Sequence, residues 1–410
     1  MNILYIAYSC SPYAGSEDKI GWSIPFESAK HNKVVVITKE EQRRGIEEFL
    51  SKNPVSNMEV HYVDIPAIYK KLFKGFLYSG RLNIWHKRAF SLAEKYCARY
   101  SIDVIHQITP VEFRAVGDYF RIPNVKFVCG PLGGGESVAE GLKYYTAGHW
   151  GVELIRGIIN RWFRFNLKLS GKLDQCDAVM FANRETQAFL SGCFQCNKTA
   201  ELYSEIGLCG DELMIENHKK QEHLKCRFLA AGRMVYRKGF DFLLDALEQL
   251  SDDLDYEFQI LGTGPEWERL NRRCADTTKL SKHVVFTGAV PYEKMEKAYN
   301  EADVFVMPSI RETTGSVILE AMCKGLPVIT IGKFGGGMLL SDEGGWLYDG
   351  SDRNACIDAL KFALEECIRN PDEVVRRGQA ARVLAEAYTW EQKLIHYQEI
   401  YRKITNRSEG

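Results

Sequence analysis

Two glutamates with seven residues between them, Glu312 and Glu320, form the clearest chemical pattern of this chain, and Gly315 lies between them. One carboxylate can accept hydrogen bonds from two adjacent hydroxyl groups, such as those of a ribose or a hexose. The pattern therefore favours a site for sugar hydroxyls. Taken alone, a capped surface helix with a solvated glutamate accounts for the same residues equally well.

The elements around these glutamates place them at one edge of a sheet. The apolar run Asp303–Met307 predicts a buried strand that ends before Pro308, and a short helix is expected from Ser316 to Lys324. Ligands of open parallel sheets bind beyond the carboxyl ends of the strands, and a helix that begins there offers free N–H groups to a phosphate. Glu312 and Glu320 are thus predicted to lie beside an anion site.

Two cations follow a second predicted strand, Phe228–Ala231. Arg233 comes directly after Gly232, and Lys238 lies five residues further on, where the next helix is expected to begin. Fixed cations at the carboxyl end of a strand can neutralise a diphosphate as charge develops on a leaving group. The alternative is a pair of loop cations in water.

Glycines and one histidine follow the other predicted strands. Such glycines let a ligand approach the backbone closely, although a bare G-x-G is weak evidence, and a histidine in this position is structural as often as it is functional. No G-x-G-x-x-G opens a helix after a strand, which disfavours a Rossmann dehydrogenase. The positions are Gly15 after Ile3–Tyr8, His106 at the end of Asp103–Ile105, Gly133, Gly134, Gly135 and Glu136 after Val125–Cys129, and Gly262 and Gly264 after Phe258–Leu261.

Short apolar runs alternate with helical patterns in both halves of the chain, which predicts an α/β protein with two Rossmann-like domains and parallel sheets. The polar segment 206–226 is the predicted linker. We expect an N-terminal domain over residues 1–205, a C-terminal domain over 227–388, and a last amphipathic helix within 389–410.

Composition narrows the functional classes. The chain has 410 residues and a formal net charge of -1, so no overall field recruits nucleic acid. The 12 cysteines have no repeating spacing, which is typical of a reduced, intracellular protein. No signal peptide and no apolar run of membrane-spanning length is recognisable. A cytoplasmic location is therefore predicted.

The order and spacing of these residues resemble the retaining glycosyltransferases of family four, over nearly the whole chain. The glutamate pair stands in a Pro-Ser…Glu…Gly…Leu-Glu-Ala-Met…Gly-x-Pro context, and Gly232-Arg233 with Lys238-Gly239 matches the phosphate-binding pair of that family. The resemblance implies the GT-B fold, with two Rossmann-like domains that face each other across a cleft. It also implies a helix after Tyr388-Thr389-Trp390 that crosses back to the N-terminal domain.

The function that the resemblance implies is a retaining, metal-independent transfer of a sugar from a nucleotide diphosphate-sugar to a saccharide or lipid-linked acceptor, without a cofactor. The run Gly130–Glu136 is similar to a subset of the family linked to bacterial surface polysaccharides. The implied roles are donor-sugar contacts for Glu312 and His106, ribose contacts for Glu320, leaving-group stabilisation for Arg233 and Lys238, donor binding for Gly15, Gly262, Gly264, Thr313, Thr314 and Gly315, and an acceptor or donor loop for Gly133, Gly134, Gly135 and Glu136.

The chain departs from the family in two loops. The family commonly has Glu-x-Phe-Gly where this chain has Glu312-Thr313-Thr314-Gly315, so Thr314 stands where an aromatic residue is common, and no proline follows the glycines of Gly335–Gly337. Two rival functions share the architecture: a sugar-nucleotide epimerase and a non-catalytic sugar-nucleotide-binding protein. Each would handle the same donor without transferring its sugar.

Two short motifs raise the question of a metal. Asp253-Leu254-Asp255 has the D-x-D spacing of metal-dependent transferases, but it precedes a predicted strand and therefore lies at the wrong end of the sheet, where a turn is the better interpretation. The pair Cys193 and Cys196 lacks the second pair of ligands that structural zinc needs. No metal site is predicted.

The segment Trp150–Lys168 mixes aromatic and aliphatic residues with arginines and a lysine. Such a stretch can lie on an anionic membrane surface, so peripheral contact with the inner face of a membrane is one prediction. A helix packed on the core with a solvated basic edge fits the same residues equally well.

Overall fold

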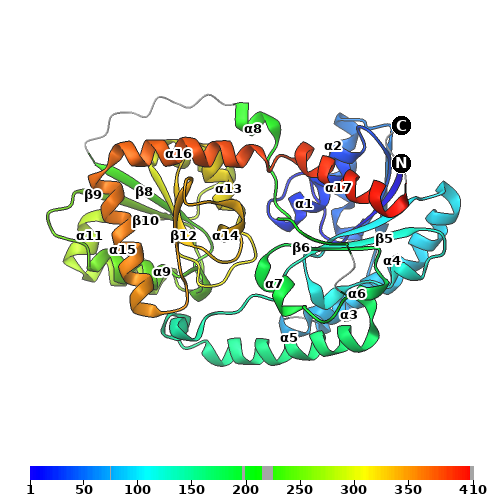
Figure 1. Cartoon of the computed structure of the whole chain (residues 1–410), viewed down its shortest axis with the longest axis horizontal. Coiled ribbons are helices and arrows are strands. Elements are labelled where there is room, and N and C mark those ends of the chain that lie inside the picture. Colours follow the sequence, from blue (N-terminus) through cyan, green and yellow to red (C-terminus); the bar gives the residue numbers. More distant parts are fainter. Residues whose placement is uncertain (74, 196–198, 215–224, 407–410) are drawn as a thin grey trace. The chain divides into compact units, whose positions relative to one another are not determined.

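The computed structural model describes residues 1–73, 75–195, 199–214 and 225–406 (Figure 1). Cys196 and residues 215–224 of the predicted linker lie outside the described residues. The chain splits into two compact units. Unit 1 comprises Met1–Gly135, Arg156–Gly207 and Trp390–Gly410, and unit 2 comprises Glu136–Ile155 and Leu208–Thr389.

Unit 1 is built on a parallel sheet whose strands, in the described residues, follow the order β3-β2-β1-β4-β5-β6-β7. Its strands are β1 (Asn2–Ala7), β2 (Lys33–Lys39), β3 (Met58–Val63), β4 (Val104–Thr109), β5 (Lys126–Leu132), β6 (Ala178–Phe181) and β7 (Thr199–Leu202). Its helical segments are α1 (Glu17–Ser28), η1 (Glu40–Gln42), α2 (Arg43–Lys52), α3 (Ala67–Leu72), η2 (Gly75–Leu77), α4 (Tyr78–Tyr100), η3 (Phe113–Ala115), η4 (Tyr119–Arg121), α6 (Lys172–Gln175), α7 (Arg184–Phe189) and α17 (Trp390–Thr405).

Unit 2 repeats this architecture with the strand order β10-β9-β8-β11-β12-β13. Its strands are β8 (Cys226–Ala231), β9 (Tyr256–Leu261), β10 (Val284–Gly288), β11 (Val304–Met307), β12 (Val328–Ile331) and β13 (Gly345–Tyr348). Its helical segments are η5 (Glu140–Thr146), α8 (Gly210–Met214), η6 (Tyr236–Lys238), α9 (Phe240–Glu248), α10 (Trp267–Asp276), α11 (Thr278–His283), α12 (Tyr292–Glu301), α13 (Ser316–Cys323), α14 (Gly336–Leu339), α15 (Arg353–Arg369) and α16 (Pro371–Glu386).

Apolar strands explain why both sheets are parallel and covered. β1, β4 and β11 are almost continuously buried, which fits strands that carry helices on both faces. The first strand of each unit, β1 or β8, lies in the interior of its sheet and pairs with two neighbours. The carboxyl ends of all strands in a unit therefore meet at one edge, where ligands of such folds bind.

The C-terminal helix belongs to unit 1. α17 contacts α1, and the two helices lie beside each other, red against blue, in Figure 1. The phenol of Tyr401 and the ammonium of Lys393 bind unit 1 as well, at His106 and at the carbonyl of Ser204. The chain thus returns to its first domain at the end, as predicted.

Helix α5 (Trp150–Ser170) begins in unit 2 and continues into unit 1. Residues 136–155 precede the predicted linker and fall within the range 1–205 expected for the first domain, but they pack with unit 2. The segment 206–226 also contains α8, whose Glu212 carbonyl accepts a hydrogen bond from the Cys323 thiol at 3.0 Å. None of the described helices is long and apolar enough to cross a bilayer.

Candidate active site

The loops after β8 and β11 lie against each other through their backbones. The N–H of Ile310 donates to the Arg237 carbonyl at 2.9 Å. Gly239 has a φ of 69°, and a Cβ there would stand 2.0 Å from the Pro308 carbonyl oxygen, so only glycine fits. This close approach sets the side chain of Lys238 opposite Glu312.

Lys238 and Glu312 form an ion pair in which the ammonium donates to Oε2 of the carboxylate. Arg237 adds a second cation, with Nη1 3.4 Å from the same oxygen. The side chains of Lys238 and Glu312 are 14% and 12% exposed, so the pair is largely shielded from solvent. Sequence reasoning named Lys238 and Glu312 separately, and the structure brings them into contact.

Burial alone would raise the pKa of Glu312, but the charges of Lys238 and Arg237 and the hydrogen bond from Lys238 outweigh it and hold this pKa below its usual value. Glu312 is therefore ionised at neutral pH. An ionised carboxylate only accepts hydrogen bonds, which suits it to hydroxyl donors.

The loop after Glu312 leads into α13. Gly315 has a φ of 84°, a left-handed conformation that favours glycine, and it caps the helix. Glu320 lies one turn further along, where its Oε2 accepts a hydrogen bond from the buried Tyr299 hydroxyl at 2.9 Å. Glu320 is half-buried and oriented by this contact, so it is more than a solvated surface residue.

Arg233 differs from Lys238, although both follow β8. Its side chain is exposed and has no hydrogen bond or ion pair with any described residue. Gly232 faces Lys238 instead, since a Cβ on Gly232 would stand 3.9 Å from the Lys238 Nζ. The predicted pair of cations thus consists of one paired lysine and one exposed arginine.

Gly262 and Gly264 are required by packing. A Cβ on Gly262, where φ is 127°, would stand 2.0 Å from the Gly232 carbonyl oxygen, and one on Gly264 would stand 2.4 Å from that of Met234. The loops after β8 and β9 therefore touch backbone to backbone. This contact accounts for both glycines without a ligand, and donor binding at Gly262 and Gly264 stays a prediction.

The departures from the family pattern lie together. Thr314 is buried, and Gly335 of the later glycine loop packs against it, with a Cβ on Gly335 placed 1.9 Å from the Thr314 carbonyl oxygen. Thr313 stands between Thr314 and the ion-paired Glu312. The two loops thus form one backbone-packed surface beside Glu312.

In unit 1 the glycine loop after β5 is held by its own unit. The Gly134 carbonyl accepts hydrogen bonds from Arg156 at 2.8 Å and from Asn160 at 3.0 Å. The Gly133 carbonyl accepts one from the Phe113 N–H, and the Gly135 N–H donates to Thr186 Oγ1 at 3.1 Å.

Glu136, which follows this loop, is 2% exposed and is the first residue of the segment that packs with unit 2. The predicted loop Gly133–Glu136 is therefore divided between the two units after its third glycine.

The expectation that His106 ends its strand is wrong. β4 continues to Thr109, so His106 lies inside the strand and is fully buried. Its Nδ1 is 2.6 Å from the Tyr401 hydroxyl, and its Nε2 is 2.7 Å from the Gly130 carbonyl oxygen. The polar residues after Ile105 made the strand seem to end there. In the structure these side chains are buried in β4, and hydrogen bonds within unit 1 satisfy them.

Burial lowers the pKa of His106 to about 3, so the imidazole is neutral at physiological pH. Both ring nitrogens are used inside unit 1. A sugar contact by His106 stays a prediction, and the described structure gives this residue a packing role.

Gly15 lies just before α1 and is exposed, with open space where a Cβ would stand. Its neighbour Glu17 is more strongly placed, since its carboxylate accepts hydrogen bonds from the Val111 N–H and from Ser9. Burial raises the pKa of Glu17. Sequence reasoning missed Glu17, because it lies close to Gly15 but has no second carboxylate at a spacing that would suggest a site.

Sequence reasoning also missed the residues that secure 136–155 to unit 2. The Glu153 carboxylate accepts hydrogen bonds from the Tyr236 hydroxyl at 2.5 Å and from Arg311 at 3.1 Å. Tyr236 and Arg311 directly precede Arg237 and Glu312. Arg237 could have been recognised from the sequence, because it is a cation directly before Lys238. Glu153 could not, because no sequence pattern links it to residues so far along the chain.

The D-x-D motif lies away from these loops. Asp253 and Asp255 precede β9 at its amino end, and they pair with Arg369 at 3.3 Å and Lys225 at 2.9 Å. Among the described residues there is no group of three or more histidine, cysteine, aspartate or glutamate side chains that could hold a metal ion.

Comparison with known proteins relates part of the chain to glycosyltransferases. Residues 225–366 match the family model described as glycosyl transferases group 1. The chain is 35% identical over 161 residues to the GDP-mannose-dependent alpha-(1-6)-phosphatidylinositol monomannoside mannosyltransferase of Mycolicibacterium smegmatis, covering 37% of this chain and 41% of the relative. It is 34% identical over 163 residues to the sulfoquinovosyl transferase SQD2 of Arabidopsis thaliana, covering 39% and 30%. These alignments span less than half the length of the curated relatives.

Solved structures extend the likeness to the whole fold. The sucrose-phosphate synthase of Thermosynechococcus elongatus superposes with a TM-score of 0.63 at 18% identity, covering 99% of this chain and 100% of the other. Anabaena HepE in complex with UDP superposes with a TM-score of 0.60 at 14% identity, covering 97% and 100%. Residues 225–366 thus match the group 1 glycosyltransferases, and the superpositions over nearly the whole chain show that it has the GT-B fold.

Proposed function

We propose that this protein is a metal-independent, retaining glycosyltransferase that moves a sugar from a nucleotide diphosphate-sugar to a saccharide or lipid-linked acceptor. The proposal rests on the cluster of Lys238, Arg237 and Glu312 at the carboxyl ends of β8 and β11. The exposed Arg233 follows the same strand β8. Cations for a diphosphate and a carboxylate for sugar hydroxyls meet there within one unit.

The residues of unit 2 divide the work as the reaction proceeds. The bond between the anomeric carbon and the diphosphate oxygen breaks, and a bond to the acceptor oxygen forms on the same face of the sugar. The acceptor proton passes to the departing diphosphate. Lys238 and Arg233 stabilise the negative charge that grows on that leaving group, Glu312 orients the sugar through its hydroxyls, and Glu320 holds the ribose.

The relatives support a nucleotide diphosphate-sugar as the donor. One relative is named as GDP-mannose-dependent, and HepE was solved with UDP and with UDP-glucose. A role in polysaccharide biosynthesis is supported by a 29% identity over 140 residues to the putative colanic acid biosynthesis glycosyltransferase WcaL of Escherichia coli. The location that we propose is the cytoplasm, at the inner face of the membrane.

Nucleotide release from a panel of UDP- and GDP-sugars tests the function, with and without saccharide acceptors and with excess chelator. A transferase releases nucleotide in an acceptor-dependent way that the chelator leaves unchanged. An epimerase converts the sugar nucleotide without releasing nucleotide, and a binding protein shows saturable binding without turnover. Activity that is lost to the chelator and restored by magnesium or manganese contradicts metal independence, and an inverted anomeric centre in the proton NMR spectrum of the product contradicts retention.

A further inference from the structure

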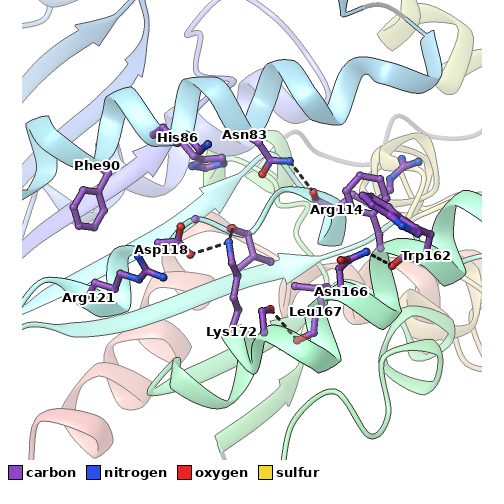
Figure 2. A pocket seen from close by; sticks show the side chains of 15 residues that line it. Asn83, His86, Phe90, Arg114, Asp118, Arg121, Trp162, Asn166, Leu167 and Lys172 are labelled. Carbon is purple, nitrogen blue, oxygen red and sulfur yellow. Dashed lines mark hydrogen bonds and ion pairs between the residues drawn. The ribbon is translucent and has the colours of Figure 1, made fainter.

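One crossover of unit 1 lacks a helix. Parallel strands are usually joined by a crossover that contains an α-helix. Between β4 and β5 the described chain forms only η3 and η4, which have three residues each. A pocket of about 630 Å³ lies beside this crossover, lined by residues of α4, of the crossover itself and of α5, and by Lys172 of α6 (Figure 2). All of its lining residues belong to unit 1, and none is a predicted catalytic or donor-binding residue, although part of the lining lies in the segment Trp150–Lys168 for which membrane contact was predicted.

The pocket carries a surplus of positive charge. Its lining includes Lys87, Arg114, Arg121 and Lys172, against the single carboxylate of Asp118. Lys172 pairs with Asp118 at 2.8 Å, as Figure 2 shows, and Arg114 pairs with Glu112. Lys87 and Arg121 are exposed and have no ion pair among the described residues. The unpaired charge favours an anionic ligand.

A buried polar atom at the pocket wall also points to a ligand. His86 is 4% exposed, and its Nδ1 is 3.0 Å from the Tyr119 hydroxyl. Its Nε2 is buried and has no hydrogen-bond partner among the described residues. Burial lowers the pKa of His86 to about 3, so its ring is neutral. Buried polar atoms are nearly always hydrogen-bonded, so an unpaired nitrogen in the lining of a cavity marks a place where a ligand or water binds.

The pocket borders an apolar ridge on α5. Trp162 lines the pocket and is 59% exposed. Ile158, Phe165 and Leu169 are exposed on the same helix, and their spacing of three and four residues puts them on one face with Trp162. Tryptophan beside aliphatic residues and cations is typical of a surface that inserts at the interface of a bilayer.

We propose that this pocket binds the phosphate-bearing headgroup of an anionic membrane lipid, while the apolar ridge Ile158–Leu169 contacts the acyl chains. Lys87 and Arg121 attract the phosphate, His86 Nε2 hydrogen-bonds the headgroup, and Trp162 lies where the polar and apolar parts of the lipid meet. Continuity between a basic pocket and an apolar ridge fits an amphiphile better than a free sugar, which has no apolar chain. The inference deepens the proposed membrane contact of Trp150–Lys168, but it does not depend on the transferase chemistry, because the pocket shares no residue with the cluster around Glu312.

Binding of a soluble lipid tests the pocket by itself. Titration with dihexanoyl phosphatidylglycerol below its micellar concentration should give saturable binding, and dihexanoyl phosphatidylcholine and inorganic phosphate should bind much more weakly. The double variant Lys87→Gln/Arg121→Gln should weaken binding about 30-fold, because each contact between a cation and the phosphate contributes about fivefold. The matched double variant Arg161→Gln/Lys168→Gln removes the same charge from exposed positions of α5 outside the pocket and should change binding little.

Vesicles test the ridge. The protein should sediment with vesicles that contain equal parts of phosphatidylglycerol and phosphatidylcholine, and Trp162→Ala should weaken this about tenfold while thermal melts stay unchanged. Equal binding of inorganic phosphate and lipid overturns the lipid assignment, as does equal loss in both double variants or no binding at all. Nucleotide release by the Lys87→Gln/Arg121→Gln variant should equal that of the parent, so failure here is distinct from failure of the proposed function.

Discussion

The strand ends of the two units use their polar groups differently. In unit 2, Lys238, Arg237 and Glu312 gather from two loops into one charged cluster. In unit 1, the glycine loop after β5 is bonded within its unit, and His106 uses both ring nitrogens in packing. Both units have the same parallel architecture, so the fold alone does not show which strand ends form a reactive site. Opposite charges that converge from distant segments are the stronger indication of a site.

The largest effect is expected at the cations of unit 2. Lys238→Ala and Arg233→Ala should each lower kcat about 30- to 1,000-fold, equivalent to about 2–4 kcal/mol, because both act on charge that grows in the transition state. Their stabilities should differ. Lys238→Ala leaves the shielded Glu312 carboxylate without its closest partner and should lower the free energy of unfolding by about 1–3 kcal/mol, whereas the exposed Arg233→Ala should change it by less than about 0.5 kcal/mol.

Steady-state kinetics combined with thermal melts separates these effects. Arg237→Ala is a useful comparison, since it removes the more distant cation from Glu312. If Arg233→Ala and Lys238→Ala both keep wild-type kcat and KM, the charged cluster is not the donor site and the distinction between the two units fails.

Glycines of the two units should respond differently to a methyl group. Gly262→Ala forces a Cβ to within 2.0 Å of the Gly232 carbonyl oxygen and should lower the free energy of unfolding by about 1–3 kcal/mol. Gly15→Ala is the matched control, because its Cβ enters open space. Urea denaturation measures both. Unchanged stability in Gly262→Ala would leave donor binding as the reason for this glycine.

A smaller effect is expected at the ribose position. Glu320→Ala should raise the donor KM about tenfold with little change in kcat, because ribose contacts are much the same in ground and transition states. Tyr299→Phe removes the hydroxyl that orients Glu320 and should raise KM less. Donor titrations at saturating acceptor measure both constants, and a selective loss of kcat in Glu320→Ala would contradict the assignment.

The smallest effect concerns His106 and pH. Burial lowers its pKa from 6.5 to about 3. Between these two pH values the unfolded chain therefore binds a proton at His106 that the folded chain does not. Its contribution to stability is therefore complete above pH 6.5 and is lost as the pH falls below that value. From this residue the free energy of unfolding should fall by about 1 kcal/mol over the first pH unit below 6.5. His106→Gln should reduce the pH slope, and an unchanged slope in chemical denaturation at several pH values would show that His106 titrates normally.

The sequence indicated most of the fold because apolar strands leave a clear pattern. The strands β7 and β13 leave a weaker pattern, because both are short, and β7 is also only half-buried and lies at the edge of its sheet. In the site, Glu312 and Lys238 were recognisable from their types and spacing. Their contact was not, because it depends on the backbone packing of Gly239 against Pro308.

Glu153 shows a further limit of the sequence. It binds Arg311 across more than a third of the chain, and the residues between them contain two domain boundaries. Local patterns carry no information about such a pair. Likewise, tertiary contacts place residues 136–155 in unit 2, and no change in amino-acid composition marks the ends of this segment.

The return of α17 to unit 1 has a consequence for synthesis on the ribosome. Domains of a growing chain generally fold in order from the N-terminus. Here His106 can contact Tyr401 only after 295 further residues have been made. Lys393, which donates a hydrogen bond to the Ser204 carbonyl, is also made only after all of unit 2. All of unit 2 is translated before unit 1 receives its last helix. The first domain to emerge from the exit tunnel is therefore the last to be completed.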